Sequence, residues 1–193
     1  MLRVVPLAVA PSMPALVRAA IAGDEAATRE LLTDILPRVR NLVRYLVRGD
    51  EDVDDIAQDA LVAVLEDLRG YRGEGRFEAW VDRIVARLTI ARLRRRRSLW
   101  KRATPYNSDL MLASGGAAAD EYLHRREMLQ TLDELPLEQR HVLVLHHALD
   151  LTVPEMADEL GIPIETVRSR LRLAKARLRN TAAWTSEEGG NTQ

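Results

Sequence analysis

The segment DLTVPEMADELGIPIETVRSRLRLAKARLR, residues 150–179, predicts two short helices joined by a tight turn. Thr152 stands at an N-cap position and Glu155 follows three residues later, which is the spacing of a capping box. Gly161 ends the first helix, because glycine adopts the left-handed conformation at little cost. Pro163 opens the second, where its missing N–H costs nothing. Apolar residues recur with helical period in both helices: Val153, Met156, Ala157 and Leu160, then Val167, Leu171, Ala174 and Leu178.

The second helix of this pair has a polar, cationic face opposite its apolar stripe. Residues 162–180 contain six Lys or Arg and one Glu. The polar face carries Glu165, Arg168, Ser169, Arg172 and Arg179. An ordinary amphipathic hairpin is the alternative interpretation, but a solvated face does not need so many cations, whereas a helix that lies against phosphates does. The segment therefore predicts a helix-turn-helix whose second helix lies in a DNA major groove.

The composition suits small helical units with aliphatic cores. The chain has 193 residues, enough for one large domain or two small ones, and it is 47% hydrophobic but only 4% aromatic. The absence of cysteine excludes disulfides and thiolate metal sites, and it is compatible with a reducing cytoplasm. No run approaches the roughly 20 apolar residues that span a bilayer.

Charge is segregated along the chain although the net charge is only −1. Residues 49–68 contain eight acids and no Lys or Arg, whereas residues 80–102 contain nine bases and one acid. The first acids complement a helix N-terminus, but this does not explain Asp59, Glu66 and Asp67. The pattern favours a protein that binds DNA on one side and a basic protein surface on another.

Helical periodicity predicts the remaining secondary structure. Apart from the helix-turn-helix, the expected helices cover about 13–22, 26–48, 52–68, 77–97, 120–134 and 137–148. Pro37 interrupts the second of these, so we expect a kink or a break near Leu36. The expected core of the acidic helix is Val53, Ile56, Ala57, Ala60, Leu61, Val64 and Leu65. That of the basic helix is Val81, Ile84, Val85, Leu88 and Leu93, with Phe77 and Trp80 as core aromatics.

The domain organisation follows from where this periodicity stops. Residues 98–119 lose helical period and contain proline, asparagine and glycine, which is typical of a linker. We therefore predict an all-α protein with two small helical domains, 13–97 and 120–180, joined by a flexible linker. Residues 1–12 are expected to form a flexible leader rather than a signal peptide, and residues 181–193 a loose tail.

Two stretches of the first domain have open interpretations. The loop GYRGEGR, residues 70–76, has three glycines, two arginines and one tyrosine. It is either a plain connector or a clasp on single-stranded nucleic acid or a phosphate. The basic end of the helix over 77–97 is either solvated or a phosphate track. We favour the track, because the macrodipole accounts for only one or two of these arginines.

Nothing in the sequence predicts catalysis, a cofactor or a metal site. The histidines are His124, His141, His146 and His147. No two of them are spaced as i, i+4, and neither HExxH nor a phosphate-binding glycine motif is present.

The order of these motifs resembles that of the extracytoplasmic-function sigma factors of the sigma-70 family. The resemblance covers about residues 16–179. It rests on DVDDIAQDALVAVLEDL, the Gly/Arg loop, FEAWVDRIVARLTIARLRRRR, the linker, and LDELPLEQR followed by PEMADELGIPIETVRSRL. Such proteins are promoter-specificity subunits of RNA polymerase without catalytic activity, small-molecule substrate or cofactor. They are cytoplasmic and are usually held inactive by an anti-sigma factor, often one at the inner membrane.

The resemblance implies three contact surfaces. The acidic helix would bind a coiled coil of the largest subunit of core RNA polymerase through Asp52, Asp54, Asp55, Ile56, Gln58 and Asp59. Contacts with the promoter minus-ten element, including a flipped base held by the loop, would come from Tyr71, Arg72, Arg76, Arg83, Arg87, Arg94 and Arg95. The minus-thirty-five element would be read by Glu165, Thr166, Arg168, Ser169, Arg170, Arg172 and Lys175. The linker would run toward the RNA exit path.

The sequence departs from the family pattern at three positions. Arg87 stands where the family usually has Asn, and Ala91 where it usually has Asp. The specific base contacts of these two positions are therefore not carried over. Glu165 replaces a common Gly of the turn, which a helical first turn tolerates.

Two other classes of function compete with the sigma factor. A conventional helix-turn-helix regulator with a helical sensor domain would need a ligand pocket or a phosphoacceptor, and the sequence shows neither. An RNA- or nucleotide-processing enzyme would need the metal or phosphate motifs that are absent.

Overall fold

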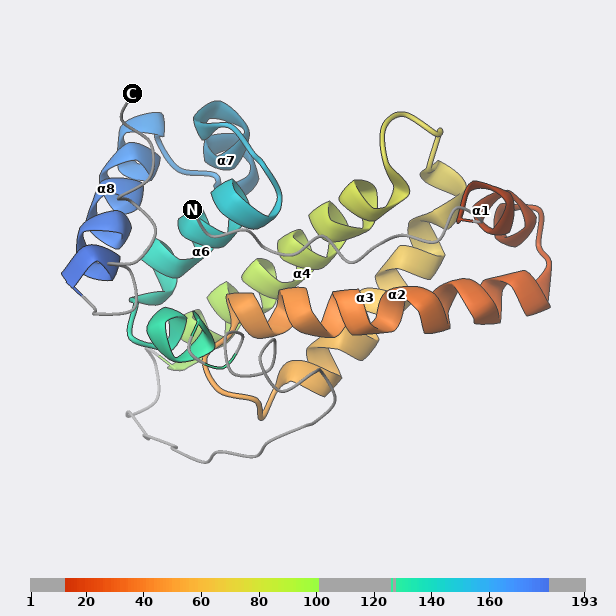
Figure 1. The fold of residues 1–193 in the computed structure, drawn as a ribbon, viewed down its shortest axis with the longest axis horizontal. Coiled ribbons are helices and arrows are strands. Elements are labelled where there is room, and N and C mark those ends of the chain that lie inside the picture. The colour runs from red at the N-terminus through yellow and green to blue at the C-terminus, as the bar shows by residue number, and fades with distance from the viewer. Residues whose placement is uncertain (1–12, 101–125, 127, 181–193) are drawn as a thin grey trace, which may run out of the picture. The chain divides into compact units, whose positions relative to one another are not determined.

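The computed structural model describes residues 13–100, 126 and 128–180, and all regular secondary structure in these ranges is helical. The helices are α1 (Met13–Ile21), α2 (Glu25–Leu46), α3 (Val53–Asp67), the short 3-10 helix η1 (Leu68–Gly70), α4 (Phe77–Trp100), α6 (Leu137–Ala148), α7 (Val153–Leu160) and α8 (Ile164–Asn180) (Figure 1). Residues 128–133 are also helical. The prediction of an all-α protein is confirmed. The described residues fall into two compact units, 13–100 and 126–180. The linker, leader and tail boundaries stay predictions, because most of those residues lie outside the described ranges.

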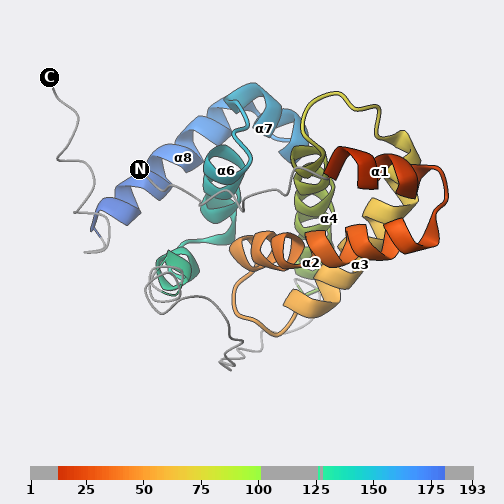
Figure 2. The same cartoon turned by 45° about the vertical axis from the view of Figure 1, so that its right-hand side comes forward.

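In the first unit α2 is the central helix and packs against α1, α3 and α4 (Figure 2). Asp24 caps its start by accepting a hydrogen bond from the backbone N–H of Ala27 at 3.0 Å. Its buried apolar residues follow a helical period and are Ala27, Leu31, Ile35, Val39, Leu42, Val43 and Leu46. This stripe forms the middle of the core of the unit.

Of the predicted kink or break near Leu36, the break is wrong, because α2 continues through Pro37 as one helix. The kink stays a prediction. A proline inside a helix removes the N–H that would bond the carbonyl four residues earlier, here that of Thr33. Thr33 and Pro37 are both exposed, so water can reach the unbonded carbonyl. Burial of Ile35 and Val39 on the opposite face holds both halves of the helix against the same core.

The core stripe of α3 is narrower than predicted. Five of the seven expected residues are buried, namely Val53, Ile56, Ala57, Ala60 and Val64. Leu61 is only half-buried, and Leu65 is 43% exposed. At 100° per residue Leu65 lies about 120° around the helix from Val53, outside the arc that α2 and α4 cover. The exposure of Leu65 therefore corrects its assignment to the core.

The inward face of α4 is rotated relative to the prediction, and the helix extends three residues further, to Trp100. Val81 and Val85 are buried as expected, but Ile84, Leu88 and Leu93 are only half-buried. Within residues 77–96 of this helix, the other buried residues are Phe77, Glu78, Asp82, Ala86, Thr89 and Ile90. Polar groups thus occupy core positions that an apolar pattern cannot predict.

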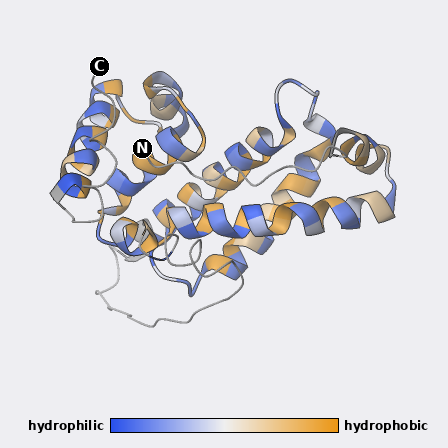
Figure 3. Cartoon of the chain, in the orientation of Figure 1, coloured by the Kyte–Doolittle hydropathy of each residue, from blue (hydrophilic) through white to orange (hydrophobic). Residues whose placement is uncertain are grey.

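In the second unit α8 packs against α6 and α7. The predicted capping box is present, with Thr152 accepting from the N–H of Glu155 while the Glu155 carboxylate accepts from the N–H of Thr152 at 2.8 Å. Gly161 ends α7 with a φ of 58°, as its left-handed conformation requires. All four residues of the expected α8 stripe are buried, whereas Val153 of the α7 stripe is half-buried. Figure 3 shows hydrophobic and hydrophilic residues alternating along the helices. The helix-turn-helix prediction is confirmed.

Arg140 forms a buried ion pair within the second unit. Its side chain is fully buried, and its Nη1 lies 2.5 Å from Oδ1 of Asp133, in the helical stretch before α6. A buried guanidinium needs such a partner. The pair therefore ties that stretch to α6, which α8 packs against.

Candidate functional site

Acids of α3 and of the segment just before it form ion pairs with arginines of α2 and α4. Asp54 pairs with Arg40 of α2 at 2.7 Å. Three other acids form ion pairs of the same kind: Asp50 with Arg44 of α2, Asp59 with Arg92 of α4, and Asp52 with Arg96 of α4. Asp59, which a helix-terminus argument left unexplained, thus has a partner within the chain. Exposed pairs contribute only about 0–1 kcal/mol each, so a partner protein can replace them.

The outward face of α3 combines acids with two exposed apolar side chains. Val62 is 50% exposed and Leu65 43%. At 100° per residue they share an arc of about 120° with Asp55, Gln58, Asp59 and Glu66. Sequence reasoning missed this feature because it placed Leu65 in the core and did not consider Val62. The sequence does contain a signal for this exposed apolar patch, because Val62 is an apolar residue that lies outside the predicted core stripe of the helix.

Of the six residues predicted for polymerase contact, Ile56 differs from the rest. It is 1% exposed and packs in the core of the first unit, so it cannot reach a partner surface. This corrects its assignment. Asp54, Asp55, Gln58 and Asp59 are exposed, and Asp52 is half-buried beside Arg96.

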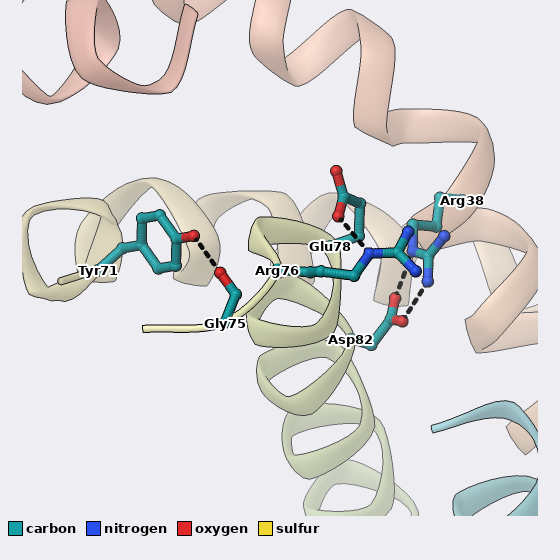
Figure 4. Close-up of polar contacts among 6 residues, drawn as sticks. All are labelled: Arg38, Tyr71, Gly75, Arg76, Glu78 and Asp82. Carbon is teal, nitrogen blue, oxygen red and sulfur yellow. Dashed lines mark hydrogen bonds and ion pairs between the residues drawn. The ribbon is translucent and has the colours of Figure 1, made fainter. Parts of the chain in front are cut away.

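The Gly/Arg loop is organised by aromatic packing. The Tyr71 hydroxyl donates to the carbonyl oxygen of Gly75 at 2.9 Å, which closes the loop (Figure 4). The Tyr71 ring packs edge-on against Phe77 at a centroid distance of 5.2 Å, and its centroid is 5.4 Å from that of Trp80. Phe77 is buried as predicted. Trp80 is only half-buried, so its ring lies beside the loop rather than inside the core. Gly73 and Gly75 have φ values of 77° and 81°, which explains why glycine is needed there.

Beside this loop lie two buried acids that sequence reasoning did not single out as site residues. Glu78 and Asp82 are 6% and 5% exposed and stand one turn apart on α4. Arg38 of α2 donates to both oxygens of Asp82, at 2.7 and 2.5 Å, and Arg76 Nε lies 3.4 Å from Oε2 of Glu78 (Figure 4). The signal for this cluster is that Asp82 is the only acid in the basic stretch.

The electrostatics of this cluster follow from burial. Burial raises the pKa of the Asp82 carboxyl, against the opposing hydrogen bond and charge of Arg38. The hydrogen bond to Asp82 in turn raises the pKa of the Arg38 guanidinium. The pair fixes the start of α4 against α2, and so fixes the base of the loop that carries Arg72 and Arg76, which are both exposed.

The basic residues of α4 form two separate groups. Arg83, Arg87 and Arg94 are exposed and lie within an arc of about 40°, on the side of α4 away from its buried face. Arg92 and Arg96 lie about 180° and 140° around the helix from Arg83, and they pair with Asp59 of α3 and with its N-cap Asp52. Arg95 is exposed between the two groups. The structure therefore brings together three of the arginines predicted for the minus-ten element on one face.

The seven residues predicted on α8 do not all share one face. Glu165, Arg168, Ser169 and Arg172 are exposed within an arc of about 100°, opposite the buried stripe. Arg168 and Glu165 form an ion pair at 2.5 Å within this arc. Lys175 lies at its edge and is half-buried. Thr166 and Arg170 are half-buried and lie nearer the buried stripe, to one side of the arc.

The histidines that the structure describes belong to no cluster suited to metal binding. In the part of the chain that the structure describes, no three His, Asp or Glu side chains are placed to hold a metal ion. His141 is buried, and the rings of His146 and His147 meet edge-on at 4.7 Å. Burial, with the nearby His146 and Lys175, lowers the pKa of His147. His124 lies outside the described residues.

None of the helices described here is long and apolar enough to span a membrane.

A helix-turn-helix with a cationic outer face, in a chain whose other unit has separate acidic and basic faces, favours a helical transcription factor. Residues 31–99 match the family Sigma-70 region 2, and residues 125–178 match Sigma-70, region 4. The chain is 34% identical over 184 residues to the ECF RNA polymerase sigma factor ShbA of Streptomyces griseus, covering 87% of this chain and 94% of that protein. It is 31% identical over 162 residues to the ECF RNA polymerase sigma factor RpoE of Cereibacter sphaeroides, covering 81% and 86%.

The fold agrees with a solved sigma factor. The sigma factor RpoE of Bartonella quintana, solved in complex with the anti-sigma factor NepR, has a TM-score of 0.56 at 20% identity, covering 79% of this chain and 94% of that one. The chain belongs to the extracytoplasmic-function (ECF) sigma factors of the sigma-70 family, as its sequence motifs predicted.

Proposed function

We propose that this sigma factor binds core RNA polymerase through the outward face of α3 and recognises promoters through two DNA-binding surfaces. The observation that carries the proposal is the α8 arc, where four exposed polar residues lie opposite a buried stripe in a chain that belongs to the sigma factors. This geometry presents a polar helix face to a major groove.

The polymerase surface is proposed to comprise Asp55, Gln58, Asp59, Val62 and Leu65, with Asp52 and Asp54 at its edges. Acids around two exposed apolar side chains suit a partner helix with basic residues around an apolar stripe. The two apolar side chains would bury apolar surface against the partner. The acids would orient the partner and raise the rate of association. Ile56 contributes through the core only.

The minus-ten surface is proposed to comprise the loop residues Tyr71, Arg72 and Arg76 and the α4 face with Arg83, Arg87 and Arg94, joined by Arg95. The half-buried Trp80 ring beside Tyr71 offers a stacking surface for an unpaired base.

The minus-thirty-five surface is proposed to centre on Glu165, Arg168, Ser169 and Arg172, with Lys175, Thr166 and Arg170 at its sides. Cationic residues there are suited to phosphates and to guanine edges.

The proposed function is tested by co-elution of the purified chain with core RNA polymerase on a sizing column in moderate salt. We expect stoichiometric co-elution, and run-off transcripts from a subset of genomic fragments with the reconstituted enzyme. Absence of co-elution by a folded chain would instead favour a conventional helix-turn-helix regulator.

Charge reversal tests the acidic surface within the same assay. Replacing Asp54, Asp55 and Asp59 by Lys should weaken polymerase binding while leaving the helical circular dichroism unchanged, because all three are exposed. A matched control replaces Glu25, Glu30 and Asp34, exposed acids of α2, by Lys. Equal binding by the α3 variant and the wild type would remove the acidic surface from the proposal.

An anti-sigma factor is proposed as a further partner, since the similar Bartonella sigma factor was solved with one. We propose a cytoplasmic location, with an anti-sigma factor at the inner membrane as one means of retention. No catalytic role is proposed for any residue. Affinity capture with the tagged chain from its own cells, followed by mass spectrometry, tests the partner, and fractionation of the same cells tests the location.

A further inference from the structure

A single acid stands in the polar arc of α8 that is proposed to read the minus-thirty-five element. Residues 164–180 contain six Lys or Arg, and Glu165 is their only Asp or Glu. Its Oε1 lies 2.5 Å from Nη1 of Arg168, and the Glu165 and Arg168 side chains are 78% and 62% exposed. An acid in the first turn complements the helix macrodipole. This accounts for helix stability, but it does not explain an acid on the face that meets DNA.

On a DNA-binding face the Glu165 carboxylate has an energetic cost. DNA carries a dense row of negative phosphates, and a like charge held close to them is repelled. A carboxylate that enters a groove also exchanges water for base edges, which is unfavourable unless a hydrogen-bond donor meets it. The pair with Arg168 offsets this cost only in part, because both side chains are largely solvated. Glu165 therefore weakens binding to every sequence that supplies it with no donor.

Few base edges supply such a donor in the major groove. Guanine presents N7 and O6, and thymine presents O4, and all three are acceptors that repel a carboxylate. Adenine offers its N6 amine, but the adjacent N7 is an acceptor that repels the second carboxylate oxygen. Cytosine presents its N4 amine with no acceptor beside it. A carboxylate is thus suited to cytosine, whereas the guanidinium of Arg168 is suited to O6 and N7 of guanine.

We propose that Glu165 is a specificity-determining residue, whose carboxylate accepts a hydrogen bond from the N4 amine of cytosine while Arg168 donates to a neighbouring guanine. The inference deepens the proposed function and rests on it, because it takes α8 as the helix in the major groove. Three residues span about 4.5 Å of a helix axis, and successive base pairs are about 3.4 Å apart. The two side chains therefore reach the same base pair or adjacent ones. On other sequences Glu165 opposes binding, so it adds discrimination rather than affinity.

The variant Glu165→Gln separates this role from a role in the helix alone. A glutamine side chain has the same shape but carries a donor and an acceptor, which match N7 and N6 of adenine. The preferred base at one position should therefore change from cytosine to adenine. Binding to unselected duplexes should rise, because a charge that the phosphates repel is removed. If Glu165 acted only on the macrodipole, its loss would lower binding by the same factor on every sequence.

The experiment assembles the full chain with core RNA polymerase, selects bound molecules from a library of randomised DNA duplexes, and sequences them. We expect the wild type to enrich a cytosine that is paired with a guanine or lies next to one. Changing this cytosine to thymine should weaken binding about tenfold, which is the size of one mismatched base pair. In the Glu165→Gln pool, adenine should replace cytosine at this position alone. The matched control Glu134→Gln removes the same charge from an exposed residue before α6, and its pool should equal that of the wild type.

The cytosine contact is overturned by unchanged base preferences in the Glu165→Gln pool, or by a changed position that is not a cytosine in the wild type. An equal change in the Glu134→Gln pool, or a uniform loss of binding on all sequences, also overturns it. Thermal melting of each variant checks the fold. If the wild type co-elutes with polymerase and enriches a sequence, these results leave the proposed function standing. Failed co-elution, or a wild-type pool with no enriched sequence, overturns the proposed function and the cytosine contact together.

Discussion

Removing one partner of the buried Arg38–Asp82 pair should destabilise the first unit by an amount that depends on which partner is left. Asp82 is 5% exposed, whereas the Arg38 side chain is 22% exposed. Arg38→Met leaves a carboxylate with almost no access to water, and Glu78 is close enough to disfavour its charge further. Asp82→Ala leaves a guanidinium that can reach solvent. Breaking a buried pair costs about 3–5 kcal/mol, so we expect about 4 kcal/mol for Arg38→Met and about 2 kcal/mol for Asp82→Ala.

The pH dependence separates this reasoning from a simple loss of packing. In Arg38→Met we expect the folded-state pKa of Asp82 to stand above its unfolded value, since burial and the charge of Glu78 raise it and only the charge of Arg76 still opposes them. Such a group contributes stability that is present at low pH and is lost as pH rises through the folded pKa. The loss of unfolding free energy in Arg38→Met, relative to the wild type, should therefore be smaller at pH 4.5 than at pH 7. The corresponding loss in Asp82→Ala should not become smaller.

The assay is urea unfolding followed by circular dichroism at both pH values. The second unit serves as an internal standard, because it contains neither residue. The double variant Arg38→Met with Asp82→Leu should be more stable than Arg38→Met alone, because it buries no unpaired charge. Equal costs for the two single variants, with no change between the two pH values, would refute the argument.

Three further changes test the second unit. Arg168→Ala with Arg172→Ala should weaken minus-thirty-five binding by about 1–3 kcal/mol for each residue that reads a base, and an equal loss on every DNA sequence in a gel-shift comparison would identify phosphate contacts instead. Burial lowers the pKa of His147, so this residue contributes stability that is present above its unfolded pKa and is lost as pH falls through its folded pKa. In His147→Gln the melting temperature should therefore fall less steeply with pH below about pH 6.5 than it does in the wild type. An equally steep fall in both proteins would contradict this. Gly161→Ala should cost about 1–2 kcal/mol because of the φ of 58°, whereas Gly70→Ala, with no positive φ, should cost less in the same melting experiment.

Elements with local signals could be predicted from the sequence. The capping box, the glycine at the end of α7 and the stripe of α8 depend on residues within a few positions of one another. Local hydrogen bonds and helical period determine them whatever the rest of the chain does. The order of such motifs was also enough to predict the family.

Predictions failed where a residue's environment depends on a neighbouring helix. The break at Pro37 did not occur, because a long buried stripe outweighs one missing hydrogen bond. Leu65 was placed in the core because periodicity shows an apolar position without showing how wide an arc its neighbours cover. The inward face of α4 was misplaced because Glu78, Asp82 and Thr89 are buried, and polar residues are invisible to an apolar pattern.

The candidate surfaces divide in the same way. The sequence by itself determined that acids gather on one helix, bases on the next and cations on the recognition helix, because charge and period are properties of the chain. Only the tertiary structure decided which of these charges meet. Arg38 lies 44 positions from Asp82, and Arg92 lies 33 positions from Asp59. An ion pair acts over a few ångströms of space, and the packing of α2, α3 and α4 sets those distances.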